Sequence, residues 1–248
     1  MNDRVTMLRL EESPFLIGGV KAVAAQALDA CIVDLDGTMV DTLGDFEVAL
    51  NHMLRTLDRP PVGRPLIERL VGKGSEHLIL SVLAHVDHAN PRAVDAVSPA
   101  LFRQAWAAYQ QHYLAINGQY SRVYPGVEEG LSALRSRGLK LACLTNKPTA
   151  FATPLLRAKG LDGYFSHVFG GDAFERKKPD PLPLRKTCEA LGTLPARTLM
   201  LGDSSNDARA ARAAGCPVVL VTYGYNHGEP VCAVDADGFV DSLVVFAE

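Results

Sequence analysis

The feature that most constrains this chain is a series of short apolar runs separated by stretches of helical periodicity. Short continuous runs of this kind are typical of strands that are buried on both faces of a parallel sheet. The predicted strands cover residues 30–35, 139–144, 198–201 and 218–222, with weaker ones at 167–169 and 238–240. The predicted helices between them cover residues 127–137, 150–159, 182–191 and 206–214. Each of these helices is followed closely by a glycine that can end it, at Gly138, Gly160, Gly192 or Gly215.

Residues 45–121 interrupt this alternation. They contain no convincing strand, but three helical stretches at 45–57, 64–85 and 99–116. We therefore expect a doubly wound, Rossmann-like α/β core with an inserted small all-helical cap domain. The core comprises residues 30–44 and 122–248, the cap comprises residues 45–121, and residues 1–29 form a poorly ordered leader.

Composition excludes several classes of protein. The formal net charge of −3 over 248 residues offers no broad basic surface for nucleic acid or an anionic membrane. No stretch approaches the roughly 20 apolar residues that a membrane helix needs. Lys21 interrupts the apolar stretch near the N-terminus, which disfavours a secretory signal. The five cysteines are scattered without a CxxC pair, which favours a reducing compartment, and we expect a cytoplasmic protein.

Polar residues gather where the predicted strands end. Ligands of open parallel sheets bind at the carboxyl ends of the strands, so these residues are the candidates for chemistry. They offer carboxylates, hydroxyls and an ammonium, which together can bind a divalent cation and a phosphate group. The candidates are Asp34, Asp36, Gly37, Thr38, Thr145, Asn146, Lys178 and the segment 202–207.

Four motifs in this order resemble those of the haloacid-dehalogenase-like phosphatases. They are DLDGT at 34–38, LTN at 144–146, KP at 178–179 and GDSSND at 202–207. Each motif alone is weak, because acidic turns also cap helices. All four, each at a strand end or a helix start, are specific, and the resemblance extends from Cys31 to nearly the end of the chain.

The resemblance implies a role for each candidate. Asp34 would attack phosphorus and form an aspartyl-phosphate, and Asp36 would protonate the leaving group and then activate water. Mg²⁺ would be held by the Asp34 carboxylate, the Asp36 backbone carbonyl and Asp203, with Asp207 as a further ligand or as a neighbour of the ligands. The residues that would bind the transferring phosphoryl group are Thr38, Thr145, Asn146 and Lys178, the last preferred to Lys177 because a proline follows it.

Lys73 is the candidate for substrate specificity. The Gly72-Lys73-Gly74 sequence lacks the spacing of a nucleotide-binding loop. Within the helical insertion it could lie over the site and contact the non-phosphate end of the substrate, or it could be a surface loop.

An inserted helical domain excludes water and large substrates, which favours a small phosphorylated metabolite. Segments 177–184, 213–219 and 222–230 are similar to bacterial phosphoglycolate phosphatases, which implies hydrolysis of 2-phosphoglycolate to glycolate and phosphate. One departure from that pattern is Met39, where the resemblance leads us to expect Leu.

Three alternatives stay open. A related phosphatase could act on another small metabolite such as a sugar phosphate, because no spacing rule reads substrate choice from the insertion. A phospho-accepting signalling domain also carries an Asp at a strand end, but the acid Asp36 next to it would speed loss of the phosphate. A non-catalytic binding module is disfavoured because no motif residue is missing.

Overall fold

The computed structural model describes residues 28–247, so the leader expected at residues 1–29 lies outside the described residues except for its last two. Those two belong to the fold. Leu28 packs against the core, and the backbone amide of Asp29 donates to the carbonyl of Arg197. None of the helices in this part of the chain combines the length and the apolar character that a membrane crossing requires.

The core is a parallel sheet of six strands in the order β5-β4-β1-β6-β7-β8. The chain runs outward from β1 through β4 to β5, and then continues on the other side of β1 through β6 to β8. The strand order therefore reverses beside β1, and open α/β sheets bind their ligands at such a switch point. The strands are β1 (Ala30–Val33), β4 (Lys140–Leu144), β5 (His167–Phe169), β6 (Thr198–Gly202), β7 (Val218–Val221) and β8 (Gly238–Val240).

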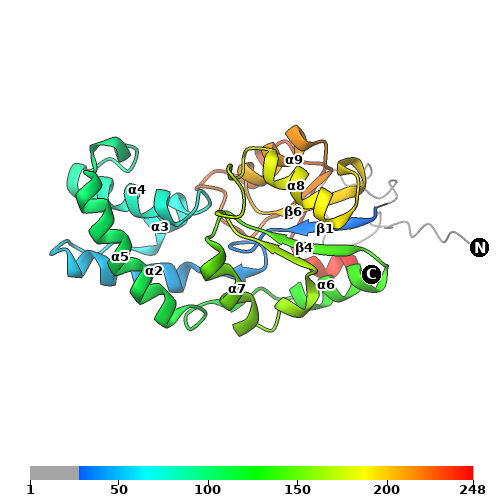
Figure 1. The fold of residues 1–248 in the computed structure, drawn as a ribbon, viewed down its shortest axis with the longest axis horizontal. Coiled ribbons are helices and arrows are strands. Elements are labelled where there is room, and N and C mark those ends of the chain that lie inside the picture. Colours follow the sequence, from blue (N-terminus) through cyan, green and yellow to red (C-terminus); the bar gives the residue numbers. More distant parts are fainter. Residues whose placement is uncertain (1–27, 248) are drawn as a thin grey trace, which may run out of the picture.

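Helices cover both faces of this sheet (Figure 1). Alternate strand residues such as Cys31 and Val33 pack on α6 (Val127–Ser136), α7 (Thr149–Ala158) and the 3-10 helix η5 (Leu243–Ala247). Their neighbours such as Ile32 pack on α8 (Leu182–Leu191) and α9 (Ser205–Ala214). Burial on both faces explains why the strands read as continuous apolar runs. The predicted doubly wound α/β fold is confirmed.

Helices α2 (Leu43–Thr56), α3 (Arg64–Leu70), α4 (Ser75–His88) and α5 (Pro99–Ile116) lie to one side of the sheet. They enclose a second hydrophobic cluster, which includes Leu50, Met53, Ile79, Tyr109 and Tyr113. Helix α5 begins where Ser98 caps it, because the Ser98 hydroxyl accepts from the backbone amide of Leu101.

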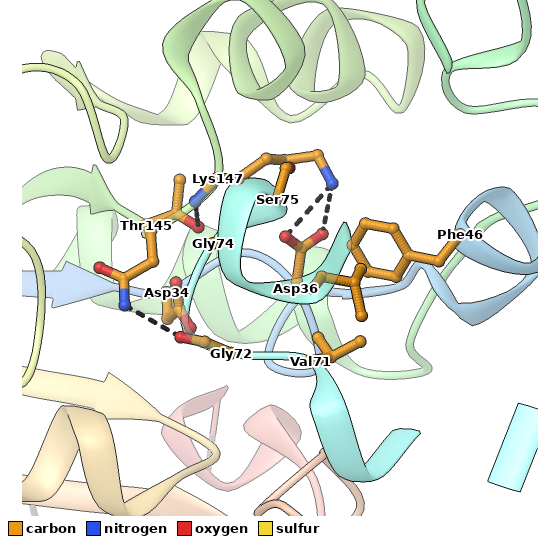
Figure 2. Close-up of a pocket in the computed structure, with 11 residues that line it drawn as sticks. Asp34, Asp36, Phe46, Val71, Gly72, Gly74, Ser75, Thr145 and Lys147 are labelled. Carbon is orange, nitrogen blue, oxygen red and sulfur yellow. Dashed lines mark hydrogen bonds and ion pairs between the residues drawn. The ribbon is translucent and has the colours of Figure 1, made fainter. Parts of the chain in front are cut away.

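One predicted helix is wrong. Residues 64–85 form two helices, α3 and α4, rather than one. The break falls at Gly72 and Gly74, whose φ angles of 113° and 90° lie outside the helical region. The intervening segment, Val71–Ser75, turns toward the carboxyl ends of the core strands, as Figure 2 shows.

A short two-stranded pairing marks the passage between the core and these helices. Strand β2 (Val40–Asp41) pairs antiparallel with β3 (Arg122–Val123). The buried carboxylate of Asp45 accepts hydrogen bonds from the backbone amides of Gly118 and Tyr120, at 2.9 and 2.7 Å. The start of α2 is thereby tied to the segment that follows α5, so the helical insertion leaves and re-enters the core at one place.

Candidate active site

Three strands and one loop bring the predicted residues together beside β1. Asp34 follows β1, Thr145 follows β4 and Asp203 follows β6. Lys178 approaches from the loop before α8, and its ammonium lies 3.0 Å from Asp34 Oδ1. The ammonium also donates to the backbone carbonyl of Leu144 at 2.8 Å. The structure therefore places Lys178 at the predicted nucleophile, whereas Lys177 pairs with Glu76 nearer the surface.

Three buried carboxylates form a cluster at this point. Asp34, Asp203 and Asp207 each offer an oxygen, and these oxygens lie within 4.8 Å of one another. Burial raises the pKa of Asp34 to about 7, with the charge of Asp207 adding to the effect and that of Lys178 opposing it. Burial and the charges of its two neighbours also raise the pKa of Asp203 well above its usual range. Such a group of hard oxygen donors fits a divalent cation, which would stabilise the ionised carboxylates.

Lys178 compensates part of this negative charge. Burial alone would lower the pKa of its ammonium, but the carboxylates of Asp207 and Asp34 outweigh burial and raise it. The ammonium lies 2.7 Å from Asp207 Oδ1. Asp207 Oδ2 accepts from the hydroxyl and backbone amide of Ser204, so both of its oxygens already have protein donors. Asp207 therefore orients Lys178 and closes the capping box at the start of α9.

A pocket lies directly above these strand ends, between the core and the Val71–Ser75 segment (Figure 2). Its walls combine polar strand-end residues with apolar residues of the helical insertion. Thr145 lines it, and so does Asp36, whose carboxylate accepts from the ammonium of Lys147 at 2.9 and 3.2 Å. The lining residues are Asp34, Asp36, Phe46, Val71, Gly72, Gly74, Ser75, Leu78, Thr145, Asn146 and Lys147.

The Asn146 side chain connects the loop at Gly72 to the loop at Lys178 by hydrogen bonds. Its side-chain amide donates to the carbonyls of Gly72 and Lys178, at 2.9 and 2.8 Å. Its side-chain oxygen accepts from the backbone amide of Lys178 at 2.9 Å. These bonds use the donors and acceptor of the amide, so Asn146 positions Lys178 and the segment above it.

Five of the predicted residues do not line the pocket: Lys178, Asp203 and Asp207 lie in the carboxylate cluster beneath it, and Thr38 and Lys73 lie elsewhere. Thr38 is fully buried beneath Asp203, with its hydroxyl 3.5 Å from Asp203 Oδ1, and it is not among the lining residues. Lys73 is exposed, and the pocket is lined by its neighbours Gly72 and Gly74 instead. The segment around Lys73 thus reaches the site through its backbone.

Two residues of the site went unnoticed in the sequence. Lys147 directly follows Asn146, and a lysine so close to the end of a buried strand is a signal that could have identified it. Tyr225 lies in the segment 222–230, which in the sequence indicated only the similarity to a family and no role for any single residue. Its backbone amide donates to Asp203 Oδ2 at 2.6 Å. Its hydroxyl donates to Asp41 and accepts from the backbone amide of Thr42, so Tyr225 links Asp203 to the passage into the helical insertion.

Known proteins are similar to this chain over most of its length. Residues 28–215 match the haloacid dehalogenase-like hydrolase family. The chain is 45% identical over 216 residues to a phosphoglycolate phosphatase from Thiobacillus denitrificans, covering 87% of this chain and 92% of the relative. It is 44% identical, with the same coverage, to a phosphoglycolate phosphatase from Nitrosospira multiformis.

The fold is also shared with solved structures. A predicted phosphoglycolate phosphatase from Haemophilus somnus superimposes with a TM-score of 0.81 at 34% identity, over 89% of this chain and 96% of that one. The motifs and the extent of these matches confirm the resemblance seen in the sequence. This chain belongs to the haloacid dehalogenase-like hydrolase family.

Proposed function

We propose that this chain is a phosphatase that hydrolyses 2-phosphoglycolate to glycolate and phosphate. The observation that carries the proposal is the position of Asp34, at the switch point of the sheet, between the ammonium of Lys178 and the carboxylate of Asp203. Relatives that share 44–45% of their residues with this chain over most of its length are phosphoglycolate phosphatases.

Asp34 attacks the phosphorus atom, and the bond from phosphorus to the ester oxygen breaks. Asp36 donates a proton to that oxygen, so the product leaves as an alcohol. In the second step Asp36 takes a proton from water, and the water oxygen attacks phosphorus. The bond to Asp34 breaks, which releases phosphate and restores both carboxyl groups.

The ammonium of Lys178, which lies beside Asp34, balances the negative charge of the phosphoryl group. The hydroxyl of Thr145, which lines the pocket, donates a hydrogen bond to that group. Asn146 and Asp207 keep Lys178 in place through the bonds described above. Asp34, Asp203 and the Asp36 backbone carbonyl would hold Mg²⁺, which would supply further positive charge at the phosphoryl group. These hard oxygen donors fit Mg²⁺ better than they fit a softer metal.

We further propose that residues 45–121 act as a cap on a core of residues 30–44 and 122–247. The segment Val71–Ser75 supports this, because it closes the pocket over Asp34 and Asp36. A closed pocket excludes water and large phosphorylated molecules, so the substrate is a small metabolite. Such a reaction and five cysteines without a disulfide are consistent with a cytoplasmic enzyme.

The test is phosphate release from 2-phosphoglycolate, several sugar phosphates and an aryl phosphate, with Mg²⁺ and with EDTA. We expect a strong preference for 2-phosphoglycolate that disappears with EDTA and in the Asp34→Asn variant. Activity on a sugar phosphate but not on 2-phosphoglycolate would replace the substrate and keep the mechanism. Absence of activity on every ester, with a stable phosphorylated Asp34, would indicate a signalling role instead.

A further inference from the structure

Lys147 is a buried cation whose place in the pocket the proposed reaction does not explain. Its side chain is 1% exposed, and its ammonium lies 2.9 Å from Asp36 Oδ1. The ammonium also lies over the rings of Phe46 and Tyr113, at 4.5 and 4.9 Å from their centroids. Figure 2 shows the end of Lys147 above the Asp36 carboxylate, with the Phe46 ring beside them. Aromatic faces stabilise a cation there, but they do not neutralise its charge.

Lys147 can bind a second anion beside Asp36. An ammonium has three N–H donors, and the hydrogen bonds of the Lys147 ammonium among the described residues go to the two oxygens of one carboxylate, Asp36. Lys147 also lines the pocket that Asp34 and Thr145 line. A negative group of the substrate in that pocket can therefore accept from the same ammonium.

The position of Lys147 fits such a group. Asp36 must reach the ester oxygen, which lies between phosphorus and the carbon skeleton of the substrate. The phosphoryl group is directed toward Asp34 and Lys178, so the rest of the substrate extends from Asp36 in the other direction. Lys147, on the helical-insertion side of Asp36, is then within reach of a group one carbon beyond the ester carbon.

Tyr113 shares the surroundings of this ammonium. The residue is fully buried, and its ring lies next to the ammonium of Lys147. It is not among the residues that line the pocket, so it stabilises the Lys147 cation through its ring and does not contact the substrate.

We propose that Lys147, with the Phe46 and Tyr113 side chains around it, binds the carboxylate of the substrate and sets its selectivity. The enzyme thereby prefers a phosphorylated hydroxy acid, with the carboxylate next to the ester carbon, to a phosphate ester of the same length that lacks the carboxylate. This inference rests on the proposed phosphatase function, and it assigns to Lys147 the contact that the sequence suggested for Lys73.

The experiment compares 2-phosphoglycolate with 2-hydroxyethyl phosphate, which replaces the carboxylate with a neutral hydroxymethyl group. In the Lys147→Gln variant, kcat/KM for 2-phosphoglycolate should fall by about 10- to 100-fold more than kcat/KM for 2-hydroxyethyl phosphate, as expected for loss of a charged hydrogen bond. Lys147→Arg should recover part of the preference. Lys186→Gln, at an exposed lysine of α8 that pairs with Glu189, is the matched control and should change neither substrate.

An equal fall for both esters would overturn the proposal, because Lys147 would then act only through Asp36. Circular dichroism verifies that each variant is folded. Wild-type turnover of 2-phosphoglycolate tests the proposed function separately. If the wild type turns over neither ester, calorimetric binding of both to Asp34→Asn, with and without Lys147→Gln, still decides the question. A selective loss of 2-phosphoglycolate binding supports the carboxylate site, and an unchanged ratio of the two affinities refutes it.

Discussion

Replacing Asp203 with Asn removes one charge from the buried carboxylate cluster and keeps the shape of the side chain. The oxygens of Asp34, Asp203 and Asp207 lie within 4.8 Å of one another. At that separation two unit charges interact by about 3.5 kcal/mol when the effective dielectric constant is about 20. Asp203 faces two like charges, and the nearby ammonium of Lys178 offsets about one of them. Removing the charge therefore relieves about 3 kcal/mol of repulsion in the metal-free protein.

A weaker hydrogen bond at residue 203 offsets part of this gain in stability. Asp203 Oδ2 accepts from the backbone amide of Tyr225 at 2.6 Å, and an amide oxygen can accept the same bond. A neutral acceptor is weaker than a charged one by about 1 kcal/mol. We therefore expect the metal-free Asp203→Asn variant to be more stable than the wild type by about 2 kcal/mol at about pH 8.

The advantage of the variant depends on pH. Burial raises the pKa of Asp34 to about 7 and raises that of Asp203. A carboxyl whose pKa is higher in the folded state stabilises the fold only while it is protonated. The free energy of unfolding of the metal-free wild type should thus fall as the pH rises from about 4 to about 7. The difference between variant and wild type should be smallest at the acid end of this range.

The assay is urea denaturation followed by circular dichroism, with EDTA and with Mg²⁺. At about a hundred times its Kd, Mg²⁺ should add about 2.7 kcal/mol to the stability of the wild type and much less to that of the variant. Asp235→Asn, at an exposed carboxylate paired with Arg212, is the matched control and should leave both values unchanged. A metal-free Asp203→Asn protein less stable than the wild type at about pH 8 would refute the electrostatic reasoning.

Two further substitutions test the supports of the site. Lys178→Met leaves Asp34 and Asp207 buried without their counter-ion, so it should abolish phosphate release and lower the free energy of unfolding of the metal-free protein by about 3–5 kcal/mol. A Lys178→Met protein with wild-type stability in urea would contradict this. Tyr225→Phe removes the hydroxyl that donates to Asp41 and keeps the backbone amide, so it should lower stability by about 1–2 kcal/mol. Mg²⁺ affinity, measured by calorimetry, should stay the same; a large loss of affinity would mean that the hydroxyl also supports the metal site.

The sequence by itself determined the α/β core and the place of the site. Parallel strands buried on both faces must be apolar throughout, which is why β1, buried at every residue, could be recognised from its apolar run. The edge strands β5 and β8 also have the bounds expected from the sequence, residues 167–169 and 238–240, although β5 is only partly buried. The polar residues that follow β1, β4 and β6 then had to meet, because parallel strands end at the same edge of a sheet. Asp34, Thr145 and Asp203 could therefore be grouped without coordinates.

Only the tertiary structure decided how the insertion meets this edge. Lys147 and Asp36 are 111 positions apart, yet they form an ion pair beside the Phe46 ring of α2. The break between α3 and α4 and the exposed position of Lys73 were likewise outside the reach of periodicity. Apolar patterning reports which face of an element is buried, but not which distant element buries it. Contacts between the helical insertion and the core depend on how two separately packed hydrophobic clusters fit together, and no local stretch of sequence contains that information.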